Sequence, residues 1–130
     1  MTRRALFASC FALAIVSCGD DGGENAPPDA AQPDGTAASV VMVTCPATPA
    51  ATVTTSDVSF VYTPADTVIT QGQVVKFTMS GTHNVAPTPG MSDPGLAVGF
   101  GEEKCLMFTQ TGTFKFFCTP HGFGGMVTVN

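Results

Sequence analysis

The stretch Phe114–Met126, with the sequence FKFFCTPHGFGGM, combines a predicted strand with a short loop that carries a thiol, an imidazole and a thioether. The three side chains follow the spacing Cys118-x2-His121-x4-Met126. Thiolate, thioether and imidazole groups bind soft or borderline transition metals, and sulfur beside imidazole selects copper or zinc. A second imidazole, that of His83, lies upstream. The sequence therefore predicts a metal site assembled from two separate segments of the chain.

The residues around these four side chains extend the pattern. They are Ile69-x2-Gly72-x2-Val75-x-Phe77, then His83-Asn84-Val85, then Phe108-x3-Gly112-x-Phe114-x-Phe116-x-Cys118-x2-His121-x4-Met126. In order and spacing, residues 60–130 resemble the small blue-copper cupredoxins of the plastocyanin and pseudoazurin type. A Cys-x2-His pair alone would be weak support for a family, because zinc sites and incidental pairs also produce it.

The resemblance implies one copper ion that cycles between Cu(I) and Cu(II), held by His83, Cys118, His121 and Met126. In such sites two imidazoles and a thiolate form a trigonal plane, and a thioether is a weak, long axial ligand. Met126 departs from the family pattern, because the final strand, Val127–Asn130, follows it directly. Met126 is therefore either the axial ligand, as its spacing from His121 favours, or the first residue of a strand packed in the core. In the second case an axial carbonyl or an empty axial position is expected.

The resemblance also assigns roles to neighbours of the ligands. In relatives, the residue equivalent to Asn84 ties the ligand loop to the strand of the first histidine, through hydrogen bonds near the residue after the cysteine, here Thr119. The ring edge of the second histidine lies at the surface in an apolar patch, which makes His121 and Phe123 the predicted electron port. The alternative is that Phe123 points inward and only covers the copper.

Short runs rich in Val, Thr and Phe, separated by Gly, Pro, Asp and Asn, predict an all-β protein. We expect strands near residues 40–45, 52–54, 58–62, 66–70, 73–79, 96–100, 104–110, 113–118 and 126–130. Alternation is clear at Phe114, Phe116 and Cys118, which should share one face of a strand. Many short strands with turns between them indicate a β-sandwich. The resemblance makes it a Greek-key β-sandwich (cupredoxin-like) with the metal site at one end.

The chain begins with a short basic head and an uncharged apolar run over residues 5–16, which is typical of a signal peptide and too short to span a bilayer. The run ends in IVSC at residues 15–18, which resembles the bacterial lipobox, whose cysteine is lipidated and becomes the new N-terminus. Ordinary signal cleavage nearby is the alternative. We predict a signal peptide at 1–17, a lipidated Cys18 with a disordered acidic tether at 18–38, and a cupredoxin domain at 39–130.

The remaining cysteines predict a disulfide. If Cys10 leaves with the signal peptide, Cys18 carries the lipid and Cys118 is a metal thiolate, Cys45 and Cys105 are left to pair in an oxidising compartment. Because the two residues are far apart in the sequence, their bridge would close a long loop and stabilise the domain by about 2–4 kcal/mol. The alternative is two buried free thiols.

Charge and histidine content restrict the function. Residues 39–130 contain three lysines and five carboxylates, so the domain has no basic patch and should not bind nucleic acid. Both histidines of the chain are assigned to the site, which leaves none for a second copper centre, and we expect no enzyme activity. We expect a monomeric one-electron carrier that docks transiently with redox proteins at an apolar patch near His121. It would be exported to the periplasmic side of the bacterial cell envelope and lipid-anchored to a membrane. The alternative is a module for copper delivery or storage.

Overall fold

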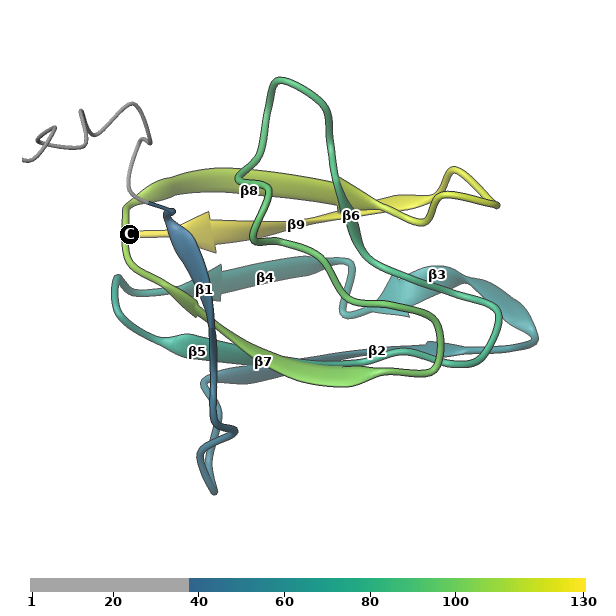
Figure 1. Ribbon diagram of the computed structural model, residues 1–130, viewed down its shortest axis with the longest axis horizontal. Helices are drawn as coiled ribbons and strands as arrows, with labels where there is room; N and C mark the ends of the chain where they lie inside the picture. The colour runs from purple at the N-terminus through teal and green to yellow at the C-terminus, as the bar shows by residue number, and fades with distance from the viewer. Residues whose placement is uncertain (1–37) are drawn as a thin grey trace, which may run out of the picture. The chain divides into compact units, whose positions relative to one another are not determined.

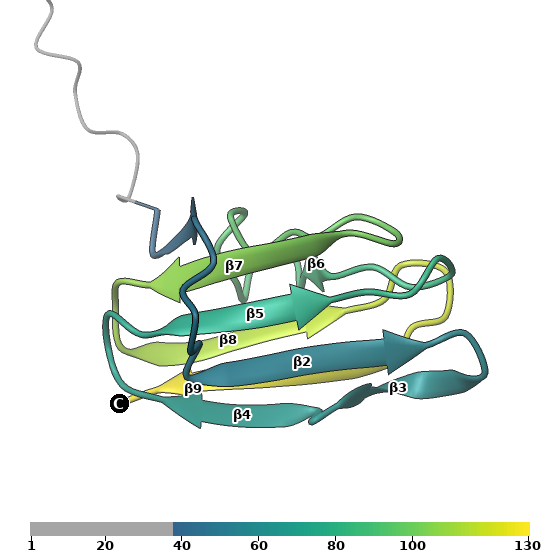
Figure 2. The ribbon, with the colours of Figure 1, turned by 90° about the horizontal axis from the view of Figure 1, so that it is seen from below.

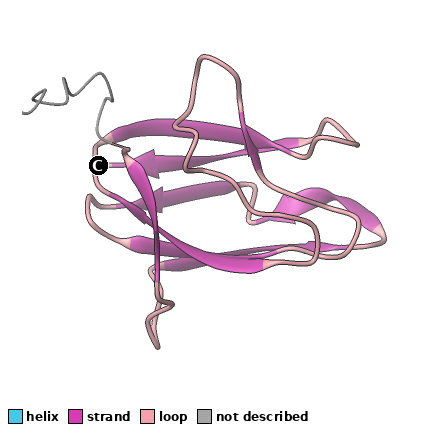
Figure 3. Ribbon diagram, in the orientation of Figure 1, coloured by secondary structure: helices cyan, strands magenta, loops and turns pink. Residues whose placement is uncertain are grey.

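The computed structural model describes residues 38–130. The predicted signal peptide, the lipidated Cys18 and all but the last residue of the predicted tether lie outside the described residues. Within this range every regular element is a β-strand (Figure 3). The same range contains no helix that is long and apolar enough to cross a membrane. The prediction of an all-β fold is confirmed.

The strands form two sheets that stack as the layers of a sandwich (Figure 1). The first sheet has the order β1-β7-β5-β2-β3 and the second the order β4-β9-β8-β6. The bounds are β1 Val40–Val43, β2 Ala51–Ser56, β3 Ser59–Thr63, β4 Asp66–Ile69, β5 Val74–Thr78, β6 Ala86–Pro87, β7 Glu103–Phe108, β8 Gly112–Phe117 and β9 Gly124–Val129. The predicted β-sandwich is thus confirmed.

Alternating apolar side chains fill the space between the sheets. On β8, Phe114 and Phe116 are buried while Lys115 between them is exposed. Phe77 of β5 meets Phe116 from the opposite sheet, with an edge-on contact and 5.6 Å between ring centroids. Full burial of a phenylalanine side chain contributes about 1.5–3 kcal/mol. The core therefore holds the end of β8, directly before Cys118, against the opposite sheet.

Two details of the strand pattern differ from the sequence prediction. The predicted strand at 96–100 is a loop, in which only Val98 forms an isolated bridge with Val85. Gly99 lies within this segment and Gly95 directly precedes it, and glycine weakens strands because it is entropically costly to order and has no side chain to pack. The structure also contains the two-residue strand β6, which is too short to produce a visible alternation in the sequence.

The predicted disulfide between Cys45 and Cys105 is present in the structure. The bridge joins residues 60 positions apart and links the segment after β1 to β7. Cys105 is almost completely buried, with an exposed fraction of 1%. Cys118 is the free cysteine of the described part of the chain, and it is also buried. One thiol is therefore available for a metal.

Three loops gather at one end of the sandwich. In both ribbon views the β2–β3 turn, the loop after β5 and the β8–β9 loop lie at the end opposite the C-terminus (Figure 2). The loop after β5 contains His83, and the segment between β8 and β9 contains Cys118 and His121. The fold therefore brings the two halves of the predicted metal motif to the same end of the molecule.

Candidate metal centre

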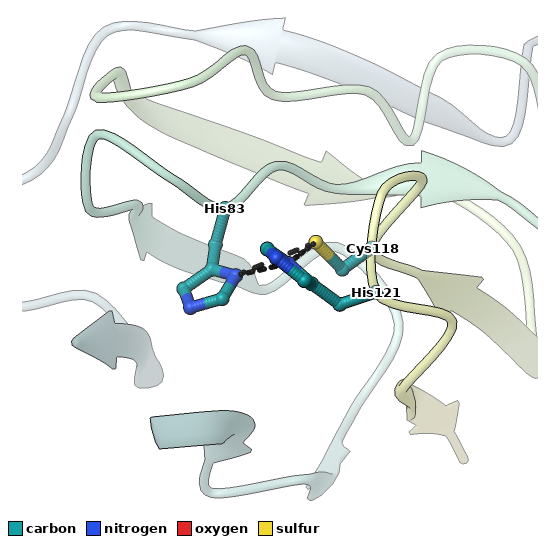
Figure 4. A group of neighbouring side chains, drawn as sticks. All are labelled: His83, Cys118 and His121. Atoms are coloured by element: carbon teal, nitrogen blue, oxygen red, sulfur yellow. Dashed lines mark hydrogen bonds between the residues drawn. The ribbon is translucent and has the colours of Figure 1, made fainter. Parts of the chain in front are cut away.

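The side chains of His83, Cys118 and His121 converge on one point (Figure 4). The Cys118 Sγ atom lies 3.5 Å from Nδ1 of His83 and 3.6 Å from Nδ1 of His121. The two Nδ1 atoms are 3.1 Å apart. His83 and Cys118 are completely buried, whereas His121 is exposed. The site is therefore enclosed on the protein side and reaches solvent through a single imidazole.

The loop that carries Cys118 and His121 is closed by two backbone hydrogen bonds. The amide of Cys118 donates to the carbonyl of Phe123 at 2.9 Å, and the amide of Gly122 donates to the carbonyl of Cys118 at 2.8 Å. Gly122 has a φ of +73°, in the left-handed region that glycine adopts without a steric cost. The loop therefore turns tightly enough for the cysteine and the histidine to face the same point.

His83 is positioned by contacts on both sides of it. Its amide donates to the carbonyl of Ser80 at 3.2 Å. Before it, the amide and hydroxyl of Thr82 donate to the Asp57 carboxylate in the β2–β3 turn, at 3.2 and 2.9 Å. Hydrogen bonds from Thr82, and then from Ser80, hold the pKa of Asp57 below its usual value. The ionised Asp57 carboxylate therefore stabilises the fold at pH values above the ordinary aspartate pKa. This stabilisation is lost as the pH falls through the lowered pKa of Asp57.

Asn84 joins the two halves of the site. Its side-chain oxygen accepts hydrogen bonds from the Thr119 amide at 2.9 Å and from the Thr119 hydroxyl at 3.2 Å. These residues follow His83 and Cys118 directly in the chain, so the contact links the positions of the two ligand segments. The expected hydrogen bonds between Asn84 and the residue after the cysteine are therefore present.

Two phenylalanine rings flank the imidazoles. Phe123 is half-buried against the core, with its ring centroid 5.0 Å from that of His83 and 6.3 Å from that of His121. Phe60 of β3 is 65% exposed and lies 4.7 Å from the His121 ring. The predicted exposed neighbour of His121 was Phe123, but the structure places Phe123 inward, as the alternative described. The exposed aromatic contact is Phe60, which no local motif singles out.

Tyr62 is a second residue that sequence reasoning missed. It is 1% exposed, and its hydroxyl donates to the backbone carbonyl of Asn84 at 2.5 Å. Its ring contacts Phe116 and Phe123, each with centroids 4.8 Å apart. Burial, and secondarily the charge of the nearby Cys118, raise the pKa of Tyr62 well above its usual value. The hydroxyl therefore stays protonated and acts as a fixed donor beneath the His83–Asn84 segment.

Removal of this hydroxyl should weaken the fold measurably. Tyr62→Phe keeps the ring contacts but leaves the carbonyl of Asn84 without its donor, which should lower the free energy of unfolding by about 1–3 kcal/mol. Urea unfolding of the copper-free protein measures this change. Unaltered stability would mean that the hydroxyl contributes nothing to holding the segment.

The structure does not bring Met126 to the three donors. Met126 lies within β9 and pairs with Lys115 of β8 and Asp66 of β4, which are both exposed. Residues directly opposite one another on neighbouring strands share a face, and successive residues alternate between faces. Cys118 continues the buried face of Phe116. The register therefore favours a strand residue on the outer face of the sheet over an axial ligand for Met126.

The three converging donors fit a soft or borderline metal ion. A point equidistant from the three atoms lies about 2 Å from each, near the metal–nitrogen and metal–sulfur distances of tetrahedral zinc sites. One thiolate and two imidazoles match the trigonal donor set of blue-copper sites. The group contains no carboxylate that could act as the base of a zinc hydrolase. The donor chemistry therefore favours copper.

Two plastocyanins are similar to this chain. Plastocyanin of Prochlorothrix hollandica is 34% identical over 76 residues, which cover 51% of this chain and 58% of the relative. The chloroplastic plastocyanin of Silene latifolia subsp. alba is 33% identical over 92 residues, which cover 58% of this chain and 56% of the relative. The chain thus matches less than two thirds of the length of either plastocyanin.

A solved structure and a family model extend the comparison. Amicyanin from Paracoccus versutus (Thiobacillus versutus) superposes with a TM-score of 0.56 and 20% identity, covering 71% of this chain and 98% of amicyanin, which shows a shared fold. The model of the copper binding proteins of the plastocyanin/azurin family matches residues 49–130, a range that contains all three donors. The chain therefore belongs to the plastocyanin/azurin family of copper-binding proteins, with His83, Cys118 and His121 as a potential site for one copper ion.

Proposed function

We propose that this protein is a blue-copper one-electron carrier in which His83, Cys118 and His121 hold the metal. It exchanges electrons with larger redox proteins and has no substrate of its own. The observation that carries the proposal is the convergence of a buried thiol and two imidazole nitrogens, from separate segments, within 4.8 Å of one another. This donor set belongs to electron-transfer copper sites.

The chain supplies fixed donor atoms that favour opposite oxidation states of copper. Bound copper provides a one-electron couple between Cu(I) and Cu(II). The Cys118 thiolate favours the cuprous state, and the imidazoles of His83 and His121 support the cupric state. The Asn84–Thr119 contact and the hydrogen-bonded loop hold these donors in place. Electron transfer should therefore require little rearrangement of the protein.

His121 is the proposed electron port, together with Phe60. His121 is the one exposed member of the three donors, and the exposed ring of Phe60 packs against it. Val58, in the turn of the same hairpin, is 92% exposed and adds apolar surface two residues from Phe60. A small apolar surface around the exposed ligand suits weak, transient docking. Phe123 supports the imidazoles from the core side.

The location and assembly of the protein follow from the same proposal. The Cys45–Cys105 disulfide is typical of an exported protein, because the bacterial periplasm is oxidising. We propose export to the periplasmic side of the cell envelope, a lipid anchor at Cys18, and a monomeric domain that binds no nucleic acid.

A redox cycle with a competing chelator tests the proposed function. Copper-loaded protein is reduced and reoxidised repeatedly in the presence of a Cu(I) chelator, and retained copper is measured after each cycle. A carrier should cycle reversibly and keep its copper, because its donors are buried and preassembled. Rapid loss of Cu(I) to the chelator would instead favour a protein for copper delivery or storage.

A further inference from the structure

The register of the β8–β9 hairpin decides which side chains can reach the metal. The hairpin pairing begins at Phe117 with Gly124, directly beyond the ligand loop. From there Gly125 pairs with the buried Phe116, and Met126 pairs with the exposed Lys115. In this register Gly124 and Met126 face away from the core, and Gly125 faces it. The thioether of Met126 is therefore on the wrong side of the sheet for a ligand.

The inward position of β9 nearest the site cannot carry a ligand either. A Cβ atom at Gly125 would lie 2.7 Å from the ring of Phe116 and 2.7 Å from the carbonyl oxygen of Ala65. Both distances are shorter than van der Waals contact allows, so Phe116 occupies the space that a side chain would need. No residue from Gly124 to Met126 therefore offers a side-chain donor to a metal held by His83, Cys118 and His121.

Phe123 is the residue of the loop that lies against the imidazoles on the core side. Its ring is nearly parallel to that of His121, at 15°, and nearly perpendicular to that of His83, at 78°. The buried methionine of the core, Met79, has its sulfur 3.9 Å from the Thr55 hydroxyl. The ring of Phe123 thus lies beside both imidazoles, stacked with that of His121 and edge-on to that of His83.

We propose that this protein holds copper with three side chains only, His83, Cys118 and His121, and that the ring of Phe123 occupies the place of a thioether ligand. This inference rests on the proposed function and refines it. Axial coordination tunes the reduction potential of such sites. A thioether donor, even a weak one, stabilises Cu(II), so an apolar ring in its place raises the potential and favours the reduced state.

Three variants of the full protein test this arrangement by voltammetry. Met126→Leu should leave the potential unchanged, because the side chain lies outside the site. Phe123→Met places a thioether where the ring packs, and it should lower the potential by the equivalent of about a tenfold gain in Cu(II) over Cu(I) affinity, or 59 mV. Phe123→Leu is the matched control, because it removes the ring without adding sulfur, and it should shift the potential less than Phe123→Met does.

The outcomes separate this inference from the proposed function. If the copper-loaded wild type shows an intense visible thiolate band but Met126→Leu raises its potential, Met126 is a ligand and only the three-ligand arrangement is wrong. If Phe123→Met and Phe123→Leu give the same potential, the ring does not occupy a ligand position. If the wild type shows no such band, both proposals are overturned.

Methionine-methyl NMR gives a second, independent readout. In the oxidised protein, the methyl resonance of an axial thioether is strongly shifted and broadened by Cu(II). The Met126 resonance, assigned by its absence from the Met126→Leu spectrum, should keep nearly the same position and width in the oxidised and reduced proteins. A strong shift of that resonance on oxidation would overturn the three-ligand arrangement.

Discussion

Cys118→Ser is expected to abolish the intense visible absorption of the oxidised, copper-loaded protein. The sulfur lies 3.5 and 3.6 Å from the two imidazole nitrogens and is the soft donor of the group. A serine hydroxyl cannot supply the thiolate-to-copper charge transfer that gives such a site its colour. We expect essentially complete loss of the band and weaker copper binding, measured by absorption spectroscopy during copper titration.

The substitution should spare the fold, because serine and cysteine differ little in size and the sandwich core is otherwise unchanged. Thr113→Ser, at an exposed position of β8, the strand that precedes Cys118, is the control and should keep the full band. A Cys118→Ser protein that retained an intense visible band would show that another group is the charge-transfer donor.

Phe60→Glu is expected to slow electron exchange by about tenfold or more while leaving the visible spectrum nearly unchanged. Phe60 contacts the exposed ligand His121 but is not itself a donor. A carboxylate in an apolar docking surface must be desolvated when a partner binds. In exchange between two copies of the protein it also meets an identical charge, and like charges brought together at an interface are unfavourable.

The control for this variant is Val68→Glu. Val68 is 68% exposed on β4, which belongs to a different sheet from β3. The variant therefore adds the same charge away from the β2–β3 hairpin. Exchange rates of both variants are measured at equal copper loading and ionic strength. If Phe60→Glu exchanges as fast as the wild type, electrons leave the protein by a surface other than the one around Phe60 and His121.

The sandwich and the three donors could be predicted from the sequence because each leaves a local pattern. The alternation of Phe114, Phe116 and Cys118 indicates a strand with one buried face, and the structure shows all three buried. The spacing Cys118-x2-His121 fits a tight loop, and the loop is closed by backbone hydrogen bonds. With only two histidines in the chain, His83 was the remaining imidazole.

The position of Met126 could not be predicted, because the same four-residue spacing fits a long loop or a strand. The face on which Met126 lies is set by the point where β8 and β9 begin to pair, at Phe117 and Gly124. A register shift of one residue would move every β9 side chain to the other face. The observed register places Gly125 against the ring of Phe116, and no spacing in the sequence reveals this contact.

Phe60 and Tyr62 were missed for a related reason. Both lie on β3, and their partners are far away in the sequence: His121 for Phe60, and the carbonyl of Asn84 for Tyr62. Only the closing of the sandwich brings the β2–β3 hairpin to the end that carries the metal ligands. Contacts of this kind depend on the topology of the fold, so the short motif around Cys118 cannot predict them.

His83, Cys118 and His121 are proposed to form one blue-copper site together. The most direct measurement is the visible spectrum of the protein loaded with one equivalent of copper, recorded oxidised, then reduced, then reoxidised. We expect an intense visible thiolate-to-copper band that disappears on reduction and returns in full on reoxidation. A protein that binds one copper ion tightly but stays colourless when oxidised would contradict it.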